Sequence, residues 1–296
     1  MIQVSVIGHG EIGSALTHML AQRSDIVVES WDKNIDIVPG QKSLSIIIPS
    51  SDVVCICVPT WSARSALQTI APLLAPQTIV VTLCKGFEKE TCMNAHELFR
   101  RNLPSTTPLV FLGGPMIAEE LLADTPTIAL AASADARARR AITELFQGTI
   151  LAIRETDDVD GAIMAGALKN VYALGLGIGD ALGIGSNAHG ALVVIAAREM
   201  ALIVQKSGGR PETAFGLSGL GDLVATAQSA NSTNYTTGIR FAQGLPPLRG
   251  SEALNTITCI ASTLENLIPK LPFLEAIRAV VLDGKDAREA MKNVLS

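Results

Sequence analysis

The feature that most constrains the fold is a set of three glycines near the start of the chain, spaced as G-x-G-x-x-G. Gly8, Gly10 and Gly13 follow a β-branched apolar run at residues 3–8 and precede apolar residues that recur at helical spacing. In such a strand, turn and helix, the first glycine permits the turn, the second lets the backbone approach a diphosphate, and the third allows close helix packing. The helix N-terminus adds free N–H groups and partial positive charge. The pattern predicts a dinucleotide-binding turn.

An acidic residue ends the next predicted strand. Asp32 lies 24 positions after Gly8, close to the roughly 20 positions expected of a carboxylate that binds a ribose. This carboxylate would accept hydrogen bonds from a ribose 2′-hydroxyl and repel a 2′-phosphate, so we favour NAD over NADP. Lys33 leaves NADP open, and capping a turn is the alternative role for Asp32. Glu11 stands between the glycines, and we expect it to point to solvent.

Short apolar runs alternate with helical patterns through the first half of the chain. Further strands are predicted at residues 25–31, 53–58, 79–83, 109–112 and 127–131, and a helix at residues 62–74. Strands that alternate with helices predict a parallel sheet with right-handed crossovers. We therefore expect an α/β protein with an N-terminal Rossmann-like, doubly wound parallel sheet.

The second half has a different pattern, because no strand-like run follows residue 156. Helical patterns cover residues 160–182 and 188–207, and the tail from Glu252 contains at least two more helices. We place a domain boundary near residue 155. Residues 1–155 are predicted to form a dinucleotide-binding domain, and residues 156–296 a C-terminal all-helical domain that carries the substrate and catalytic residues.

Composition and charge exclude several classes of protein. Hydrophobic residues make up 48% of the chain and charged residues 17%, which is typical of a packed globule and not of a disordered chain. The net charge is −5 and no basic run occurs, so nucleic acid is not expected as a partner. The longest charge-free stretch, residues 65–84, contains two prolines and several polar residues, so no membrane span is expected.

Cysteine and histidine usage bears on compartment and metal binding. The five cysteines are odd in number and contain no C-x-x-C pair, and the chain starts directly with a strand pattern instead of an export leader. These observations favour a reduced, cytoplasmic compartment. The four histidines show no metal-ligand spacing, so no metal is expected.

One lysine lies in an otherwise uncharged part of the helical half. No charged residue occurs between Gly161 and Leu168 or between Asn170 and Gly179. If this stretch is one helix, Lys169 shares a face with small side chains, which lets another backbone approach and exclude water from the amine. Desolvation disfavours the ammonium form and suits the amine to proton transfer. A lysine that reaches solvent at the helix edge is the alternative.

Two further features place polar side chains near predicted element ends. In GLSGLGDLVAT, glycines bring Asp222 to a predicted helix start, and Thr226 lies one turn further on the same face. Three roles are open for Asp222, which are capping this helix, orienting Lys169 and binding a substrate hydroxyl. Lys85 follows the strand at residues 79–83, at the carboxyl edge of the sheet where ligands of this architecture bind. The glycine turn at residues 113–115 lies at the same edge.

With these residues in view, the chain resembles the NAD(P)-dependent glycerol-3-phosphate dehydrogenase family over nearly its whole length. The match is strongest in the helical half, which carries GALKNVYALGLGIGDALGIGSNAHGAL, GLSGLGDLVAT and SANSTNYTTG in the family's order and spacing. In the first half, GHGEIG, CKGFE and GGPMIAEEL are similar to the family's glycine-rich, K-G and G-P-x-x-A-E elements. A series of motifs in this order is highly specific.

The resemblance implies that Lys169 is the general base in alcohol oxidation. It also implies that Asp222, Thr226, Asn234 and Lys85 line the substrate site. The predicted catalytic residues are Lys169, Asp222 and Lys85. The predicted cofactor-binding residues are Gly8, Gly10, Glu11, Ile12, Gly13, Asp32, Lys33, Pro59, Lys85, Ala118 and Glu252. The predicted substrate-binding residues are Lys85, Gly114, Met116, Lys169, Asn170, Asp222, Thr226, Ser232, Thr233 and Asn234.

The chain departs from the family pattern where the substrate would bind. The family has Ser-Arg-Asn, with the arginine on the substrate phosphate, where this chain reads Ser232, Thr233 and Asn234. The missing charge-assisted contact would cost a phosphorylated substrate on the order of 2 to 3 kcal/mol. Met116 replaces a small hydroxyl residue, and the stretch at residues 33–51 is shorter than in the family and has no predicted helix.

The sequence therefore predicts an NAD-dependent oxidoreductase that moves a hydride between NAD(H) and the secondary alcohol or ketone of a small three-carbon substrate. Glycerol 3-phosphate and dihydroxyacetone phosphate are the default pair. The same chemistry on an unphosphorylated or carrier-linked hydroxy compound is one alternative, and an NAD(H)-binding sensor or partner subunit without turnover is another. Apolar helices in the second half favour a homodimer, by analogy with the fold alone.

Overall fold

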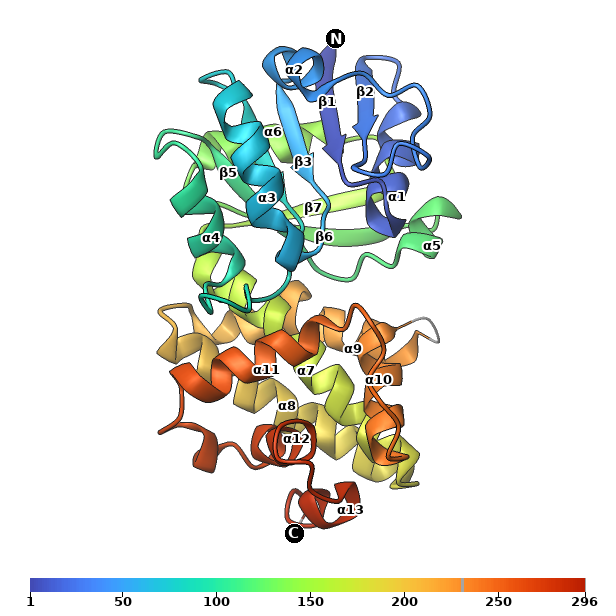
Figure 1. Cartoon of the computed structure of the whole chain (residues 1–296), viewed down its shortest axis with the longest axis vertical. Coiled ribbons are helices and arrows are strands. Elements are labelled where there is room, and N and C mark those ends of the chain that lie inside the picture. The colour runs from blue at the N-terminus through green and yellow to red at the C-terminus, as the bar shows by residue number, and fades with distance from the viewer. Residues whose placement is uncertain (230–231, 296) are drawn as a thin grey trace. The chain divides into compact units, whose positions relative to one another are not determined.

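The computed structural model describes residues 1–229 and 232–295, and these form two compact units (Figure 1). The sheet unit comprises Met1–Lys85 and Ala95–Val159, and the helical unit comprises Gly86–Asn94 and the residues from Asp160 onward. Each unit has a hydrophobic core of its own.

The sheet unit is built on seven strands. They are β1 (Ile2–Ile7), β2 (Ile26–Trp31), β3 (Val53–Ile56), β4 (Ile79–Thr82), β5 (Leu109–Gly113), β6 (Thr127–Ala132) and β7 (Leu151–Thr156). Their order in the sheet is β2-β1-β3-β4-β5-β6-β7, and β1 to β5 run parallel. The strand order reverses between β1 and β3, which is where ligands bind in open α/β sheets.

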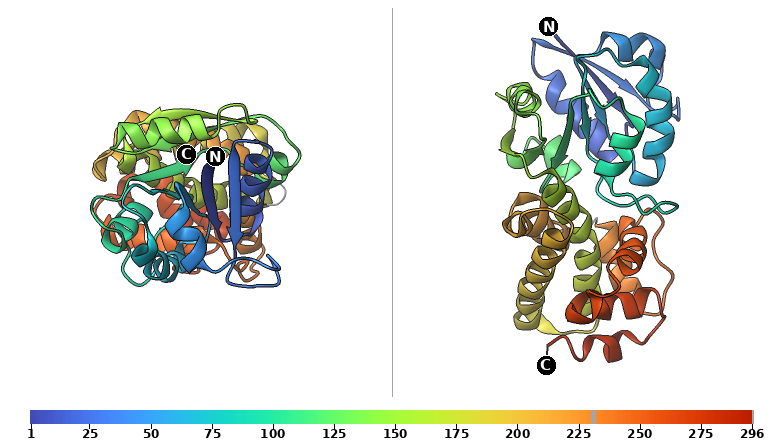
Figure 2. Two further views of the ribbon diagram at one scale, coloured as in Figure 1. Left: turned by 90° about the horizontal axis from the view of Figure 1, so that it is seen from above. Right: turned by 90° about the vertical axis from the view of Figure 1, so that its left-hand side faces the viewer.

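Helices cover both faces of this sheet (Figure 2). They are α1 (Glu11–Ala21), α2 (Leu44–Ile47), α3 (Thr60–Ile70), α4 (Ala95–Asn102), α5 (Ala118–Leu122) and α6 (Ala136–Leu145). Alternate strand residues such as Val53 and Cys55 join one core cluster with α1, α5 and α6. Because both faces are covered, strands such as β3 are buried throughout and read as continuous apolar runs.

The structure corrects the predicted sheet in two respects. The sheet is not wholly parallel, because β6 runs antiparallel to β5 after a connection whose helix, α5, has only 5 residues. Strand β7 was not predicted, and it pairs parallel with β6. In the structure the sheet unit extends to Val159 and includes β7. The stretch at residues 33–51 does contain one helix, the short α2.

The helical unit is built around one long buried helix. Its helices are α7 (Val159–Ala181), α8 (Gly185–Lys206), α9 (Asp222–Gln228), α10 (Thr233–Ala242), α11 (Glu252–Thr263), α12 (Pro272–Val281) and α13 (Ala287–Met291). Every residue from Gly161 to Gly179 in α7 is buried. Helices α7 and α8 lie side by side (Figure 2). The predicted all-helical character of this half is confirmed for its described residues.

Glycines let α10 approach the backbone of α7. A Cβ atom at Gly177 would lie 2.1 Å from the carbonyl oxygen of Tyr235, and one at Gly238 would lie 1.9 Å from the carbonyl oxygen of Leu174. Both distances are far below van der Waals contact, so the two helices pack backbone against backbone. This contact places the start of α10 beside α7.

Among the described residues, two helices are long and apolar enough to span a membrane, α7 and α8. The most apolar 18-residue window of α7 is 100% buried inside the protein, and that of α8 is 44% buried. The apolar surface of α7 is therefore used in the protein core.

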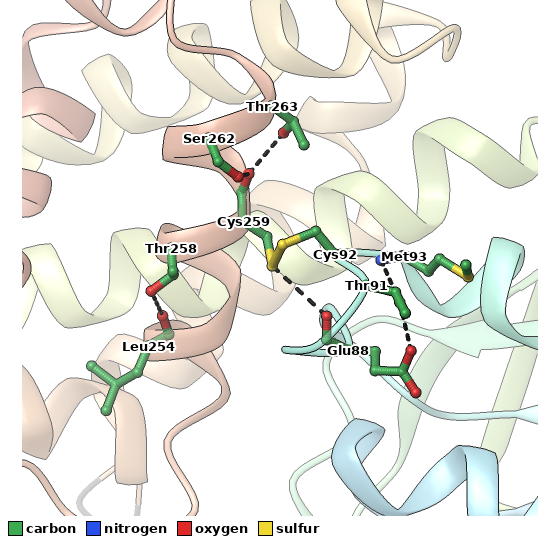
Figure 3. The surroundings of a disulfide bond; sticks show 9 residues. All are labelled: Glu88, Thr91, Cys92, Met93, Leu254, Thr258, Cys259, Ser262 and Thr263. Carbon is green, nitrogen blue, oxygen red and sulfur yellow. Dashed lines mark hydrogen bonds between the residues drawn. A yellow bond between two sulfur atoms is a disulfide. The ribbon is translucent and has the colours of Figure 1, made fainter.

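Two of the five cysteines form a disulfide, which differs from the reduced state that the sequence favoured. Cys92 and Cys259 are bonded, with their Cα atoms 5.2 Å apart (Figure 3). The residues are 167 positions apart, and they meet because Gly86–Asn94 leaves the sheet unit and packs in the helical unit. Cysteine spacing carries no signal of such a contact.

Candidate active site

The glycine turn after β1 has the geometry that the sequence predicted. Gly8 has φ +91°, and a Cβ at Gly13 would lie 1.9 Å from the Gly8 carbonyl oxygen. Both positions require glycine for the fold itself. At Gly10 a Cβ would meet nothing within 4 Å, so the space beside this residue is open. Gly10 also precedes the first turn of α1 and has no side chain to cap it, so N–H groups of that turn point to the open space. These residues fit a dinucleotide diphosphate.

Asp32 ties the end of β2 to the glycine turn. Its Oδ2 accepts a hydrogen bond from the backbone N–H of His9 at 2.8 Å, and its Oδ1 accepts one from the N–H of Asn34 at 2.8 Å. The predicted turn-capping role is therefore present. A carboxylate oxygen can accept more than one hydrogen bond, so ribose binding is compatible with these contacts. Lys33 and Glu11 are both exposed.

Lys85 and the glycine turn after β5 meet at the carboxyl edge of the sheet. The Lys85 amine donates a hydrogen bond to the Gly114 carbonyl oxygen at 3.1 Å. Gly114 has φ +109°, which glycine adopts freely. Met116 packs against the sheet core, and Ala118 begins α5. Pro59 and Ile12 lie at the starts of α3 and α1, the helices that follow β3 and β1.

The second group of predicted residues lies in the helical unit around Lys169. The lysine is 8% exposed on α7, and Asp222 is 4% exposed at the start of α9. The Lys169 amine lies 3.1 Å from Asp222 Oδ1 and donates a hydrogen bond to the Thr226 hydroxyl at 2.9 Å. That hydroxyl donates in turn to Asp222 Oδ1 at 3.3 Å. Of the roles considered for Asp222, the geometry supports orientation of Lys169.

Local sequence explains why these three side chains meet. A Cβ at Gly219 would lie 2.1 Å from the Ala214 carbonyl oxygen, so only glycine allows the tight π-helical turn Leu217–Gly221 that leads into α9. Asp222 and Thr226 are four residues apart and share one face of α9. A buried ammonium costs free energy unless it is paired, and the carboxylate supplies the pairing.

Asn170, the neighbour of Lys169, extends the polar group to two further helices. The side-chain amide of Asn234, at the start of α10, donates to Asn170 Oδ1 at 2.9 Å. Asn234 Oδ1 accepts hydrogen bonds from the Ser251 hydroxyl at 2.9 Å and from the backbone N–H of Ala253 at 3.2 Å. Asn234 therefore connects α7 with the start of α11, where Glu252 is the first residue. Sequence reasoning missed Ser251 and Ala253, which carry no motif of their own.

The residues at the site of the missing arginine begin a helix. Ser232 caps α10, because its hydroxyl accepts the backbone N–H of Tyr235 at 3.2 Å. Thr233 is the first residue of that helix. Within the described part of the chain, no group of three or more His, Cys, Asp or Glu residues could hold a metal ion. Lys85 belongs to the sheet unit and Lys169 to the helical unit, so the predicted site residues form two groups.

A glycine turn at the reversal point of a parallel sheet defines a class of proteins that bind a dinucleotide. A buried lysine paired with a carboxylate in a second, helical unit is suited to proton exchange with a substrate. Together these features define the dinucleotide-dependent dehydrogenases that carry their proton-transfer residues on helices.

Comparisons with known proteins identify the family. Residues 36–139 match the N-terminal model of NAD-dependent glycerol-3-phosphate dehydrogenase, and residues 158–292 match the C-terminal model. The chain is 33% identical to the glycerol-3-phosphate dehydrogenase [NAD(P)+] of Clostridium acetobutylicum, over 99% of this chain and 96% of the relative. It is 31% identical to that of Listeria innocua, over 98% and 94% of the two chains. The chain belongs to the NAD-dependent glycerol-3-phosphate dehydrogenase family.

A solved structure shows the same fold. The glycerol-3-phosphate dehydrogenase of Coxiella burnetii superposes with a TM-score of 0.90 at 24% identity, over 100% of this chain and 99% of the other. The protein is thus an NAD(P)-dependent oxidoreductase that acts on a CH–OH group, as predicted.

Proposed function

We propose that the protein interconverts glycerol 3-phosphate and dihydroxyacetone phosphate with NAD(H) as its preferred cofactor. The observation that carries this proposal is the buried group in which Lys169 contacts Asp222 at 3.1 Å and Thr226 at 2.9 Å. A secondary alcohol loses its hydroxyl proton when it is oxidised, and the neutral form of the buried Lys169 amine can take that proton, while the ammonium form, which Asp222 pairs, returns it in the reverse reaction.

NAD, when bound, supplies the hydride acceptor for this reaction. The chain's own residues bind, orient and exchange the proton. The first turn of α1 and the open space at Gly10 hold the diphosphate, and Asp32 selects the ribose 2′-hydroxyl. Lys169 exchanges the proton of the substrate hydroxyl, while Asp222 and Thr226 fix the amine by their contacts with it. Lys85 and Asn234 are proposed to bind the polar end of the substrate.

An altered substrate is the second candidate, and Thr233 is the observation that favours it. A threonine hydroxyl cannot replace the planar guanidinium that holds a phosphate through two charge-assisted hydrogen bonds. Steady-state kinetics with dihydroxyacetone phosphate and with unphosphorylated three-carbon alcohols separate the two candidates. Normal turnover of dihydroxyacetone phosphate at micromolar KM would refute the altered-substrate candidate.

Substitution of Lys169, the proposed base, tests whether the protein is an enzyme with turnover or a sensor without it. In Lys169→Ala, NADH binding is expected to stay unchanged while turnover falls by roughly 10² or more. Lys206, an exposed lysine at the end of α8, provides the matched control, and Lys206→Ala should keep full turnover. Because Lys169→Ala removes the cation that faces the buried Asp222 carboxylate, the double variant Lys169→Met/Asp222→Asn, which removes both charges, checks that the loss is not caused by unfolding. Equal activity in Lys169→Ala and the parent protein would favour a sensor without turnover.

We also propose a cytoplasmic homodimer. Exposed apolar side chains on α8, such as Val194 at 52% and Leu202 at 46%, support association through the helical unit. Light scattering after size-exclusion chromatography gives the oligomeric state directly. A monomer at all concentrations tested would remove the dimer from the proposal.

A further inference from the structure

The disulfide joins two segments of the helical unit that are far apart in sequence. Cys92 lies in Gly86–Asn94, the segment between β4 and α4, and Cys259 lies in α11 (Figure 3). The remaining cysteines, Cys55, Cys57 and Cys84, are buried thiols in the sheet unit. Of the five cysteines, Cys92 and Cys259 alone are bonded, and their bond lies where Gly86–Asn94 packs in the helical unit.

Gly86–Asn94 is a compact turn with contacts of its own. The backbone N–H of Glu88 donates to the Met93 carbonyl oxygen at 2.9 Å, and the N–H of Cys92 donates to the Glu88 carbonyl oxygen at 2.9 Å. The Thr91 hydroxyl donates to the Glu88 carboxylate at 2.5 Å. Phe87 is 5% exposed and belongs to the helical core. These contacts shape the turn, and the disulfide is its covalent link to α11.

The surroundings of the bond suit both redox states. The sulfur of Cys259 lies 3.8 Å from the Glu88 carbonyl oxygen (Figure 3). A disulfide sulfur has no proton to donate, but the thiol formed on reduction has one, and this carbonyl is placed to accept it. Cys259 is 1% exposed, whereas Cys92 is only partly buried. Cys92, the less buried of the two residues, is therefore the one that a thiolate from solution would attack first.

Both ends of the bond lead to predicted site residues. Lys85 immediately precedes Gly86–Asn94 in the chain. Helix α11, which carries Cys259, begins at Glu252, and its neighbours Ser251 and Ala253 bind Asn234. The disulfide therefore links the segment after Lys85 to helix α11, whose start holds Asn234. Both Lys85 and Asn234 are proposed substrate-binding residues.

We propose that Cys92 and Cys259 form a reversible redox site that switches the activity of the protein. A dithiol reductant opens the bond when its thiolate attacks the Cys92 sulfur, the S–S bond breaks, and Cys259 leaves as a thiolate and takes up a proton. The second thiol of the reductant then displaces Cys92 and closes the reductant's own disulfide. Two electrons and two protons pass to the protein. Reduction frees the segment after Lys85 and lowers kcat/KM.

The first test measures the bond and the segment without any substrate. The full chain is equilibrated with oxidised and with reduced dithiothreitol, alkylated, and mapped by mass spectrometry, with amide hydrogen exchange followed in parallel. We expect a linked peptide containing Cys92 and Cys259 only in the oxidised sample. Reduction should raise amide exchange in residues 86–94 by about tenfold. Absence of the linked peptide, or unchanged exchange on reduction, overturns the proposal.

The second test measures activity and rests on the proposed function. On reduction, kcat/KM for dihydroxyacetone phosphate should fall by about fivefold, as expected when a segment beside a site is loosened. The single variants Cys92→Ser and Cys259→Ser should have the kcat/KM of the reduced parent, and oxidised or reduced dithiothreitol should not change it. The double variant Cys92→Ser/Cys259→Ser keeps the other three thiols, so any redox response in it would overturn the proposal. Equal kcat/KM in the oxidised and the reduced parent would also overturn the proposal. In that case the first test still shows whether the disulfide forms and opens.

Discussion

At the scale of single residues, the charge of Asp222 is expected to matter more than its hydrogen bond. Asp222→Asn keeps an oxygen that can accept a hydrogen bond but removes the charge that pairs with the buried Lys169 amine. We expect kcat to fall by about 10², measured by steady-state NADH absorbance. Thr226→Val removes the hydroxyl contacts with Lys169 and Asp222 but keeps the carboxylate charge, and it should cost less. A kcat in Asp222→Asn equal to that of the parent would contradict the proposed orienting role.

A substitution at Thr233 that adds a phosphate-binding group tests which class of substrate the protein takes. Thr233 is the first residue of α10, and Asn234 beside it belongs to the polar group around Asn170. Thr233→Arg would restore a guanidinium there, and the KM for dihydroxyacetone phosphate should fall by about tenfold or more. Thr233→Met provides a side chain of comparable length without charge. If arginine and methionine give the same KM, no phosphate binds at this position.

The site residues differ in how much of their role the sequence could show. The glycine turn is local, so the spacing of Gly8, Gly10 and Gly13 predicted both the turn and its open face. Lys169 was singled out because it stands in an uncharged stretch, and its pairing with Asp222 was one of several roles considered. Asn234 was expected from the family resemblance. Its contacts with Ser251 and Ala253 join positions 17 and 19 residues apart, and no local pattern encodes such contacts.

At the scale of elements, the N-terminus of α12 depends on a buried carboxylate. Glu199 on α8 accepts hydrogen bonds from the backbone N–H groups of Phe273 and Leu274 at 2.8 and 2.9 Å, and from the Tyr172 hydroxyl at 2.9 Å. Both carboxylate oxygens are used, whereas glutamine has one acceptor oxygen. Glu199→Gln should therefore lower the free energy of unfolding by about 1 to 3 kcal/mol. Tyr172→Phe removes one of the three bonds and should cost about 1 kcal/mol.

The same carboxyl predicts a pH dependence of stability. Burial raises the pKa of Glu199 above its ordinary value of 4.5, and its hydrogen bonds act in the opposite direction. The folded state then binds the proton more tightly than the unfolded state, so the free energy of unfolding falls as pH rises from 4.5 through the folded-state pKa. Urea unfolding of the parent should show this loss, and Glu199→Gln should lack it. Parallel pH profiles for the two proteins would contradict the assignment.

The elements themselves were largely predictable, and the exceptions have physical causes. Short buried strands such as β3 were recognised from their apolar runs, and α7 and α8 from their length. Strand β7 was missed because Arg154 and Glu155 interrupt its apolar pattern at the edge of the sheet. The antiparallel direction of β6 depends on how the chain returns after α5, and hydrophobic period carries no information about direction.

At the scale of the whole molecule, each unit has its own hydrophobic core, and the glycine turn proposed to bind the dinucleotide lies in the sheet unit. Substitutions at three glycines can test the requirements of the fold separately from those of cofactor binding. A Cβ at Gly13 would lie 1.9 Å from the Gly8 carbonyl oxygen, whereas a Cβ at Gly10 or at Gly190 would meet nothing within 4 Å. Gly10 faces the proposed diphosphate site, and Gly190 lies on α8 in the helical unit.

Calorimetry with and without NADH should therefore distinguish the three positions. A ligand present at 100 times its Kd stabilises the parent by about 2.7 kcal/mol through mass action. Gly10→Ala should unfold like the parent without NADH but lose most of this gain, because the added methyl group fills the space for the diphosphate. Gly190→Ala should keep both properties, and Gly13→Ala should be destabilised even without ligand, since its methyl group has no room. A full NADH gain in Gly10→Ala would place the cofactor elsewhere in the protein.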